Sequence, residues 1–436
     1  MGFLDSLFLP PSADHLHLIK YILMLVYFIH FPFISLMLGG TLFSLFYYFL
    51  GKRDKNELYI RLSQDWIDKL VFRKSAGIIL GILPLFILFL IEGQILYGAN
   101  IMVPRFLMYS IVLIATGMTL IYFYQGTVRI LEEATGASLL FGGLGILFLM
   151  GGYLLFSTSS ALLLDPGRWA TVKDLPHLLF SWNVVARSAH FFFAALTISA
   201  IGLYFLKMVW PEREELPDAD YGEFLRKTTL GLAFGLTLLQ PPFIFWNVVT
   251  MPNIALSEKV IGLAIAVLLV ILMVSVYLYR MLNSRENKYG YRVVVLFLVA
   301  FLLIIADEHY ARENAGENHS AILIAQAEAL ESEIEARREA EMASMIKVDL
   351  NLGKQVFTNQ CTSCHQFDKK VVGPAYNEVL DKYASNVEAL EKFIQNPQKI
   401  NPDFPAMPKL GLNLSQTKSV AAFLLQEYQK KQEGTN

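Results

Sequence analysis

Residues 18–49 read LIKYILMLVYFIHFPFISLMLGGTLFSLFYYF, and Lys20 is the only Lys, Arg, Asp or Glu among them. A helix needs about 20 consecutive apolar residues to cross a bilayer. Because the run at residues 18–49 is longer than this, we expect its helix to tilt or to protrude from the bilayer. The pattern predicts an all-α fold that begins with an eight-helix transmembrane bundle. Seven further apolar runs complete that bundle, at residues 75–98, 104–125, 138–163, 180–207, 228–249, 259–282 and 291–308.

Composition supports a membrane protein. The chain has 436 residues, of which 55% are hydrophobic and 17% are charged. The net charge of −2 gives no indication of nucleic-acid binding. The N-terminal residues lack a basic segment followed by a short apolar core, so we expect no cleaved signal peptide.

The apolar character ends near residue 308, which divides the chain into three parts: a transmembrane domain (1–308), a helical linker (309–345) and a small helical domain (346–436). The linker is rich in Ala and Glu, and its helix of about 26 residues would be about 39 Å long. A solvated spacer is the simpler interpretation. The alternative is a helix that docks on a partner through Ile322, Leu323, Leu330 and Ile334.

Loop charges predict the orientation. The loops after the first, third, fifth and seventh runs carry 16 Lys and Arg residues, whereas the opposite side carries five. Cytoplasmic loops are enriched in Lys and Arg, so both termini should lie outside the cytoplasm.

Pro241 and Pro242 lie inside the sixth run and should kink that helix, leaving carbonyl groups that need partners.

The segment CTSCH (361–365) contains both cysteines of the chain, Cys361 and Cys364, followed by His365. C-x-x-C-H is the attachment motif of haem c. Zinc is an alternative for short Cys patterns, but it would need further Cys or His ligands, and His365 is the only histidine after residue 345. Met407 is the only methionine of residues 346–436 and could complete a His/Met iron pair. The alternative is that Met407 belongs to the core.

Four segments of the C-terminal part resemble class I cytochromes c. They are GKQVFTNQCTSCH (353–365), VVGPAY (371–376), PAMPKL (405–410) and SVAAFLLQ (419–426). The resemblance implies one covalent haem c with thioethers to Cys361 and Cys364, iron ligands His365 and Met407, and Pro374 beside the histidine. It also implies that this domain lies outside the cytoplasmic membrane, in agreement with the loop charges.

Two histidines, His30 and His190, fall clearly within the apolar runs. An ionisable residue inside a bilayer is a functional candidate, and beside a cytochrome domain the expected role is ligation of haem b. The alternative is a hydrogen bond to a neighbouring helix. Arg187, one turn before His190, could pair with a haem propionate or extend to the surface.

The membrane part resembles subunit I of the cytochrome bd quinol oxidase family in IHFPFISLMLGG (29–40), IEGQILYG (91–98), STSSALLLDPGRW (157–169) and ARSAHFFFAALTISAIGLYFLK (186–207). The resemblance implies that His30 binds a high-spin haem b, that His190 binds a low-spin haem b, and that a second membrane subunit is present. Three features depart from that family. The loop after the sixth run is only VTMPNIALSE, and the third run has no carboxylate. For a methionine ligand of the low-spin haem, the only candidates are Met251 and Met273.

Other polar residues near the outer ends of the runs have two interpretations each. Glu92 could carry protons or line a polar pocket. Asp307, Glu308 and Arg312 could form a polar site, although a solvated helix end is the simpler interpretation.

These features predict a bacterial cytoplasmic-membrane protein that transfers electrons between haem c outside the membrane and haem b or quinone-linked centres of a larger complex. Its expected partners are other membrane subunits, such as a subunit like bd subunit II. A periplasmic electron carrier and quinone are also expected partners. One alternative is an enzyme, a bd-like oxygen reductase supplied by its haem c. The other is a simple membrane anchor for a cytochrome c.

Overall fold

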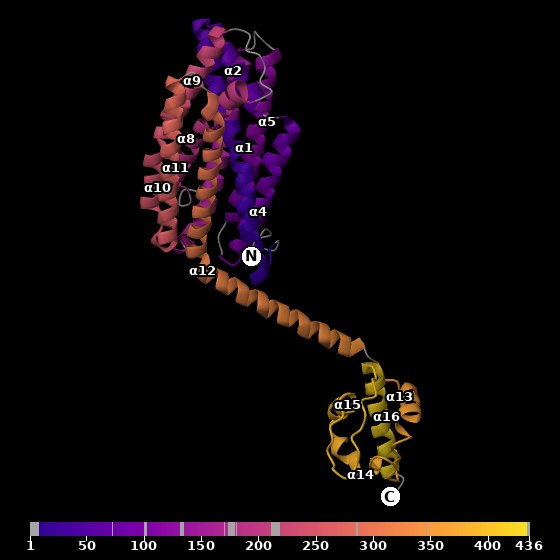
Figure 1. Ribbon diagram of the computed structural model, residues 1–436. Helices are drawn as coiled ribbons and strands as arrows, with labels where there is room; N and C mark the ends of the chain where they lie inside the picture. Colours follow the sequence, from indigo (N-terminus) through magenta and orange to yellow (C-terminus); the bar gives the residue numbers. More distant parts are fainter. Residues whose placement is uncertain are drawn as a thin grey trace. The chain divides into compact units, whose positions relative to one another are not determined.

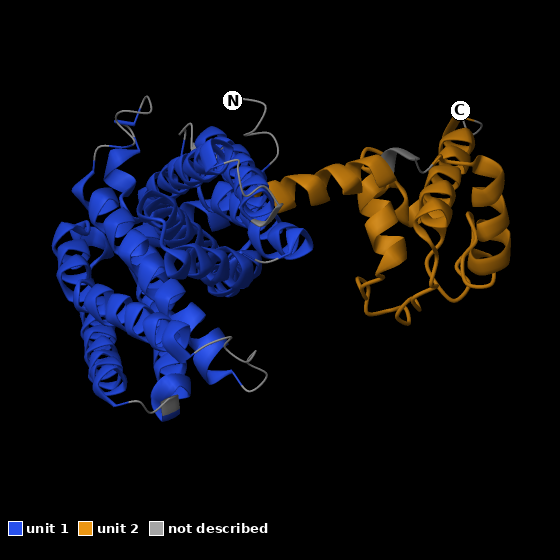
Figure 2. Ribbon diagram, turned by 90° about the horizontal axis from the view of Figure 1, so that it is seen from above, with its two compact units in different colours: residues 1–328 blue, residues 329–436 orange. Residues whose placement is uncertain are grey.

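The computed structural model describes residues 8–71, 73–99, 103–130, 135–169, 171–172, 179, 181–210, 219–284, 287–345 and 347–433. The chain forms two compact units, Met1–Glu328 and Ala329–Asn436 (Figure 2). Of the basic residues used to predict the orientation, Lys173, Arg213 and Arg285 lie outside the described residues.

The first unit is a bundle of helices (Figure 1). Within the described ranges, eight helical segments are long and apolar enough to cross a membrane, as predicted. The helices are α1 (Ala13–Asp54), α2 (Glu57–Leu70), α3 (Lys74–Ala76), η2 (Gly77–Ile82), α4 (Leu83–Ile95), α5 (Val103–Ile130), α6 (Thr135–Ala161), η3 (Leu162–Leu164), η4 (Pro166–Arg168), α8 (Trp182–Tyr204), η5 (Phe205–Val209), α9 (Ala219–Leu238), α10 (Gln240–Thr250), η6 (Asn253–Ala255), α11 (Glu258–Asn283), η7 (Asn287–Tyr289) and α12 (Gly290–Met345).

Helix α1 packs closely on two neighbours through a glycine pair. A Cβ at Gly39 would collide with Ser199 and with the Ala195 carbonyl of α8, and a Cβ at Gly40 would collide with Leu70 of α2. Small residues at helix contacts let backbones approach closely in a membrane. The glycine pair of the first apolar run therefore serves helix packing in this structure.

The sixth span is broken at its prolines. Helix α9 ends at Leu238, and α10 begins at Gln240 with Pro241 and Pro242 in its first turn. The Gln240 side chain donates from Nε2 to the Leu236 carbonyl at 3.2 Å, so one carbonyl near the break has a side-chain partner. The predicted interruption is confirmed. The carbonyls that the prolines free are those of Thr237 and Leu238, and their need for partners stays a prediction.

One end of the bundle is held by an ion pair and two hydrogen bonds. Lys207 Nζ lies 2.9 Å from Asp65 Oδ1, and the Tyr221 hydroxyl donates to Asp65 Oδ2 at 2.5 Å. Arg226 donates to the Met281 carbonyl at 3.0 Å. These contacts join α2, η5, α9 and α11 at the end that carries most of the basic loop residues.

Helix α12 continues without a break through residue 308, where the last apolar run was predicted to end. Leu323 is 1% exposed, so the first part of the predicted linker packs on the bundle. Ile322 and Ile334 are exposed, and residues 331–342 are exposed throughout, as a solvated spacer would be.

The second unit ends in a small helical domain, α13 (Leu350–Val356), η8 (Phe357–Cys361), α14 (Tyr376–Val379), η9 (Asp381–Tyr383), α15 (Val387–Gln395) and α16 (Leu414–Glu433). Its core includes Val356, Cys361, Leu380, Val420 and Leu424. Helices α13 and α16 cross at Gly353, where a Cβ would overlap the backbone of Ser419.

Candidate functional site

A cavity of about 490 Å³ in the second unit collects the predicted haem c residues. Cys361, Cys364, His365 and Pro374 line it from η8 and the segment that follows, and Met407 lines it from the chain between α15 and α16. Apolar residues such as Leu390, Ile394 and Leu424 form other parts of the wall. Residues 42 positions apart in sequence thus meet around one largely apolar space.

The imidazole of His365 has a fixed orientation. Its Nδ1 lies 3.0 Å from the Pro374 carbonyl, which can only accept, so Nδ1 carries the proton and Nε2 is left as a donor to iron. The ring stacks on Tyr376 with centroids 5.0 Å apart. A Cβ at Gly373 would overlap the imidazole, so this position has room only for glycine.

A tight turn brings the two cysteines and His365 together. The backbone N–H groups of Cys364 and His365 both donate to the Cys361 carbonyl, at 3.1 and 2.9 Å. Burial raises the pKa of the Cys361 thiol above its ordinary value. Two thiols, an oriented imidazole and a thioether around an apolar space are the donor set that haem c requires, so these residues fit that cofactor. Their individual roles remain predictions.

His30 has the same type of second contact as His365. It is 2% exposed, and its Nδ1 lies 3.0 Å from the carbonyl of Leu80 in the π-helical turn η2. A histidine that binds a metal usually donates its other ring N–H in this way. His30 therefore fits a haem ligand in donor chemistry, although the same bond also satisfies a helix-to-helix contact.

His190 lines a smaller space, which we name the inner cavity. It has a volume of about 170 Å³, and its other lining residues include Tyr153, Phe191, Gln240, Asp307 and Glu308. This volume is about a third of that of the cavity in the second unit, so the inner cavity does not fit a tetrapyrrole as it stands. Met251 is buried among Leu164, Ala255 and Val260, and Met273 is 49% exposed; neither lines the inner cavity.

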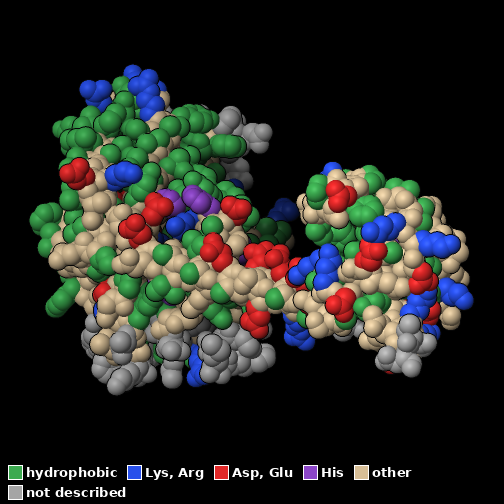
Figure 3. All heavy atoms as spheres, turned by 90° about the horizontal axis from the view of Figure 1, so that it is seen from below, with side chains coloured by type: hydrophobic (Ala, Val, Ile, Leu, Met, Phe, Trp, Pro, Cys, Tyr) green, Lys and Arg blue, Asp and Glu red, His purple; other side chains and the backbone are tan. Residues whose placement is uncertain are grey.

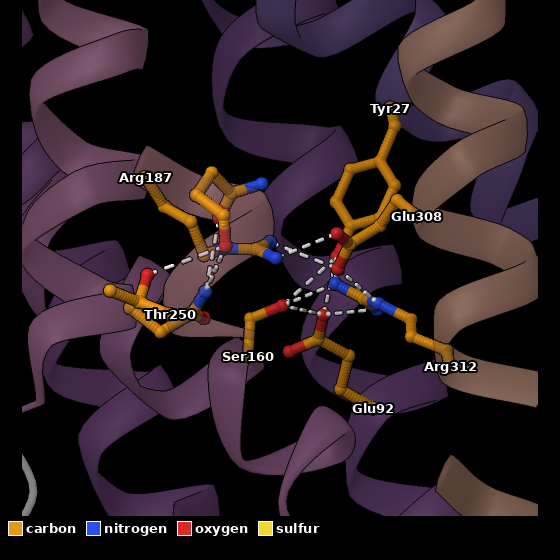
Figure 4. A network of polar contacts seen from close by, with 9 residues as sticks. Tyr27, Glu92, Ser160, Arg187, Thr250, Glu308 and Arg312 are labelled. Atoms are coloured by element: carbon orange, nitrogen blue, oxygen red, sulfur yellow. Dashed lines mark hydrogen bonds and ion pairs between the residues drawn. The ribbon is translucent and has the colours of Figure 1, made fainter. Parts of the chain in front are cut away.

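A buried set of six residues borders the inner cavity, and we name it the polar network: Tyr27, Glu92, Ser160, Arg187, Glu308 and Arg312 (Figure 4). Arg312 donates from Nη2 to Tyr27 at 2.8 Å and to Ser160 at 2.6 Å, and from Nη1 to Glu92 at 3.2 Å. Its Nε donates to Glu308 at 2.7 Å. Arg187 holds both oxygens of Glu308, at 2.7 and 2.9 Å. Two cations and two carboxylates thus balance inside the bundle.

The interpretation of Glu308 and Arg312 as a solvated helix end is wrong. Their side chains are 17% and 10% exposed, because α12 continues past residue 308 and carries them against α1, α4, α6 and α8. The sequence also gave no reason to select Tyr27 or Ser160. Hydroxyl side chains are common in these helices, as in the run STSS (157–160), and only the charged groups around Tyr27 and Ser160 mark them as part of a site.

Residues 350–427 match the family model described as cytochrome c. The second unit therefore carries a cytochrome c domain, which implies a covalent haem c. No characterised protein and no solved structure gives a significant match to the chain.

Proposed function

We propose that this protein is a membrane-bound electron-transfer cytochrome. The observation that carries the proposal is the cavity of the second unit, where the two cysteines and His365 face the same space as Met407. A haem c held there would supply one reversible electron. The protein contributes the fixed imidazole, the soft thioether of Met407 and the apolar part of the cavity wall, and a His/Met ligand pair favours a high potential.

The membrane unit extends the proposal. Eight apolar helices exceed what an anchor needs, and the loop charges favour an orientation in a bacterial cytoplasmic membrane with both termini on the periplasmic side. We therefore infer that the cytochrome c domain exchanges electrons with a soluble periplasmic carrier and with redox centres of a membrane complex. A second membrane subunit is proposed from the resemblance to the bd family.

Haem b belongs to this proposal through His30. The support is the Nδ1 bond to Leu80, which matches the bond that orients His365 at the same distance of 3.0 Å. His190 is the weaker candidate, because the inner cavity beside it is small. We expect His30→Ala to lower the ratio of haem b to haem c in a pyridine haemochrome assay. An unchanged ratio would reject His30 as a ligand of haem b.

The central test replaces Met407. Met407→Ala should keep haem c attached, because the thioethers depend on the cysteines, but should lower its potential and open a site for carbon monoxide. Met342→Ala is the matched control, since this side chain is 60% exposed and lies away from the cavity. A potential that stays equal in both variants, with no carbon monoxide binding, would reject Met407 as ligand.

A truncation tests the route of electron exchange. Removing residues 346–436 should abolish rapid reduction of any membrane haem by a reduced periplasmic carrier, measured by stopped flow. Equal rates in the full-length and the truncated protein would show that the cytochrome c domain is not the conduit.

A further inference from the structure

Two cavities meet at the polar network. The inner cavity lies on one side of it. On the other side is a cavity of about 50 Å³, which we name the end cavity, lined by residues that include Lys20, His309, Glu313, Gly316 and His319. Tyr27, Ile305, Glu308 and Arg312 line both cavities, so the polar network forms their common wall.

The end cavity lies near the surface. The side chain of Glu313 is 46% exposed and lies 3.8 Å from Lys20 Nζ. Figure 3 shows histidine, acidic and basic side chains gathered on this end of the bundle. An aqueous phase can therefore reach the end cavity past charged groups.

Several buried polar atoms along these cavities have no hydrogen-bond partner in the protein: Glu92 Oε2, Gln240 Oε1, Asp307 Oδ1 and His319 Nε2. Gln240 and Asp307 line the inner cavity, His319 lines the end cavity, and Glu92 belongs to the network between them. The orientation of the Gln240 amide is fixed, because its Nε2 faces the Leu236 carbonyl, which can only accept. Buried polar atoms almost always find partners, and in a roomy polar cavity that partner is water.

Both cavities can hold water. A cavity needs about 10–15 Å³ for one water molecule, so the end cavity at about 50 Å³ and the inner cavity at about 170 Å³ both exceed this minimum. Between them, the Tyr27 and Ser160 hydroxyls both contact Glu92 Oε1, at 2.5 and 2.7 Å. Hydroxyl groups both donate and accept, so they can pass a proton between waters on the two sides.

Asp307 is the carboxylate at the inner end. Glu308 has both oxygens on Arg187 and Arg312, whereas Asp307 presents a buried oxygen without a partner. We propose that the end cavity, the polar network and the inner cavity form a hydrated path that exchanges protons between the aqueous phase and Asp307. This path goes beyond the electron-transfer role and does not depend on it.

Hydroxyl-radical footprinting tests whether the cavities are wet. X-ray radiolysis of a bound water labels the side chain beside it, even in a protein interior. In the full-length protein with haem c attached, Tyr27 and Tyr153, at 4% and 8% exposed, should be labelled at least about tenfold faster than Tyr124, which is 0% exposed and lines neither cavity. Rates as low as that of Tyr124, as expected for dry cavities or for a haem in the inner cavity, would overturn the proposal.

Mixing the protein with water labelled with oxygen-18 before irradiation tests the route by which water enters the cavities. Gly316→Phe should plug the end cavity, because a Cβ there has only Ser320 Oγ within 4 Å, at 3.9 Å. Gly262→Phe is the matched control, since a Cβ there meets nothing within 4 Å and Gly262 lies on α11 and does not line the end cavity. Arrival of oxygen-18 at Tyr153 should slow about tenfold in Gly316→Phe alone, as expected for waters held behind a plug.

Equal arrival rates in the two variants would show that water enters elsewhere, and would overturn the path. Thermal unfolding and the haem c spectrum verify that both variants are folded. Neither footprinting result changes the expected effect of Met407→Ala, so failure of the path is distinguishable from failure of the electron-transfer proposal.

Discussion

Replacing Arg312 by Met should destabilise the membrane unit more than any exposed charge substitution. The Arg312 side chain is 10% exposed and contacts two carboxylates and two hydroxyls. Met fills a similar volume without charge. The variant leaves Glu92 and Glu308 with Arg187 as the only cation of the polar network.

The contacts of Arg312 set how much free energy of unfolding the variant loses. If it acted only through its four hydrogen-bond partners, at about 0.6 kcal/mol each in a membrane protein, the loss would be about 2.4 kcal/mol. If an uncompensated buried charge dominates, the loss is about 3–5 kcal/mol. Glu92 is 0% exposed and forms its ion pair with Arg312, at 3.2 Å, so we expect the larger value.

A second substitution separates the two causes. Glu92→Gln in the Arg312→Met background removes the uncompensated charge and should recover most of the lost free energy of unfolding. The assay is equilibrium unfolding of the full-length protein in mixed micelles, followed by tryptophan fluorescence. Arg53→Ala is the control, since Arg53 pairs with Asp54 at 58% and 42% exposure and should leave stability unchanged.

Two results would refute this reasoning. One is an Arg312→Met variant as stable as Arg53→Ala, which would mean that Arg312 does not compensate the charge of the buried carboxylates. The other is no recovery in the double variant, which would mean that hydrogen bonds and not charge set the loss.

Three further predictions concern the second unit. Gly353→Ala should lower its stability by about 1–3 kcal/mol, measured by denaturant unfolding followed at the haem absorbance, because the Cβ meets the backbone of Ser419 and cannot be relieved by a rotamer change. Gly373→Ala should displace the imidazole of His365 and weaken the low-spin haem spectrum; an unchanged spectrum would mean that the loop moves instead. The hydrogen bond from Lys431 holds the pKa of Asp368 below its ordinary value of 3.8, so Asp368→Asn should be less stable than the wild type at neutral pH. That difference should disappear as the pH falls through the lowered pKa, because the stabilisation exists only while Asp368 is ionised; a difference that persists in acid would contradict the role of the pair.

The sequence by itself determined the class of fold and the position of the cytochrome c domain. Eight apolar runs are each long enough to satisfy their own backbone groups within a bilayer, so helix number follows from local composition. CTSCH is also a local signal, because the chemistry of its Cys361, Cys364 and His365 lies within five residues. Even the break at Pro241 is local, since proline lacks the N–H group that a helix needs.

The polar network was decided only by the tertiary structure. Glu92, Ser160 and Arg312 come from helices far apart in the sequence, and nothing near any of them indicates which partner it meets. The same holds for Leu323, which is buried because α12 continues as a helix beyond the last apolar residues and packs on the bundle there. Local composition decides whether a helix forms and whether it enters a membrane, but the charge state and function of a buried polar side chain depend on neighbours that only helix packing brings within hydrogen-bond distance.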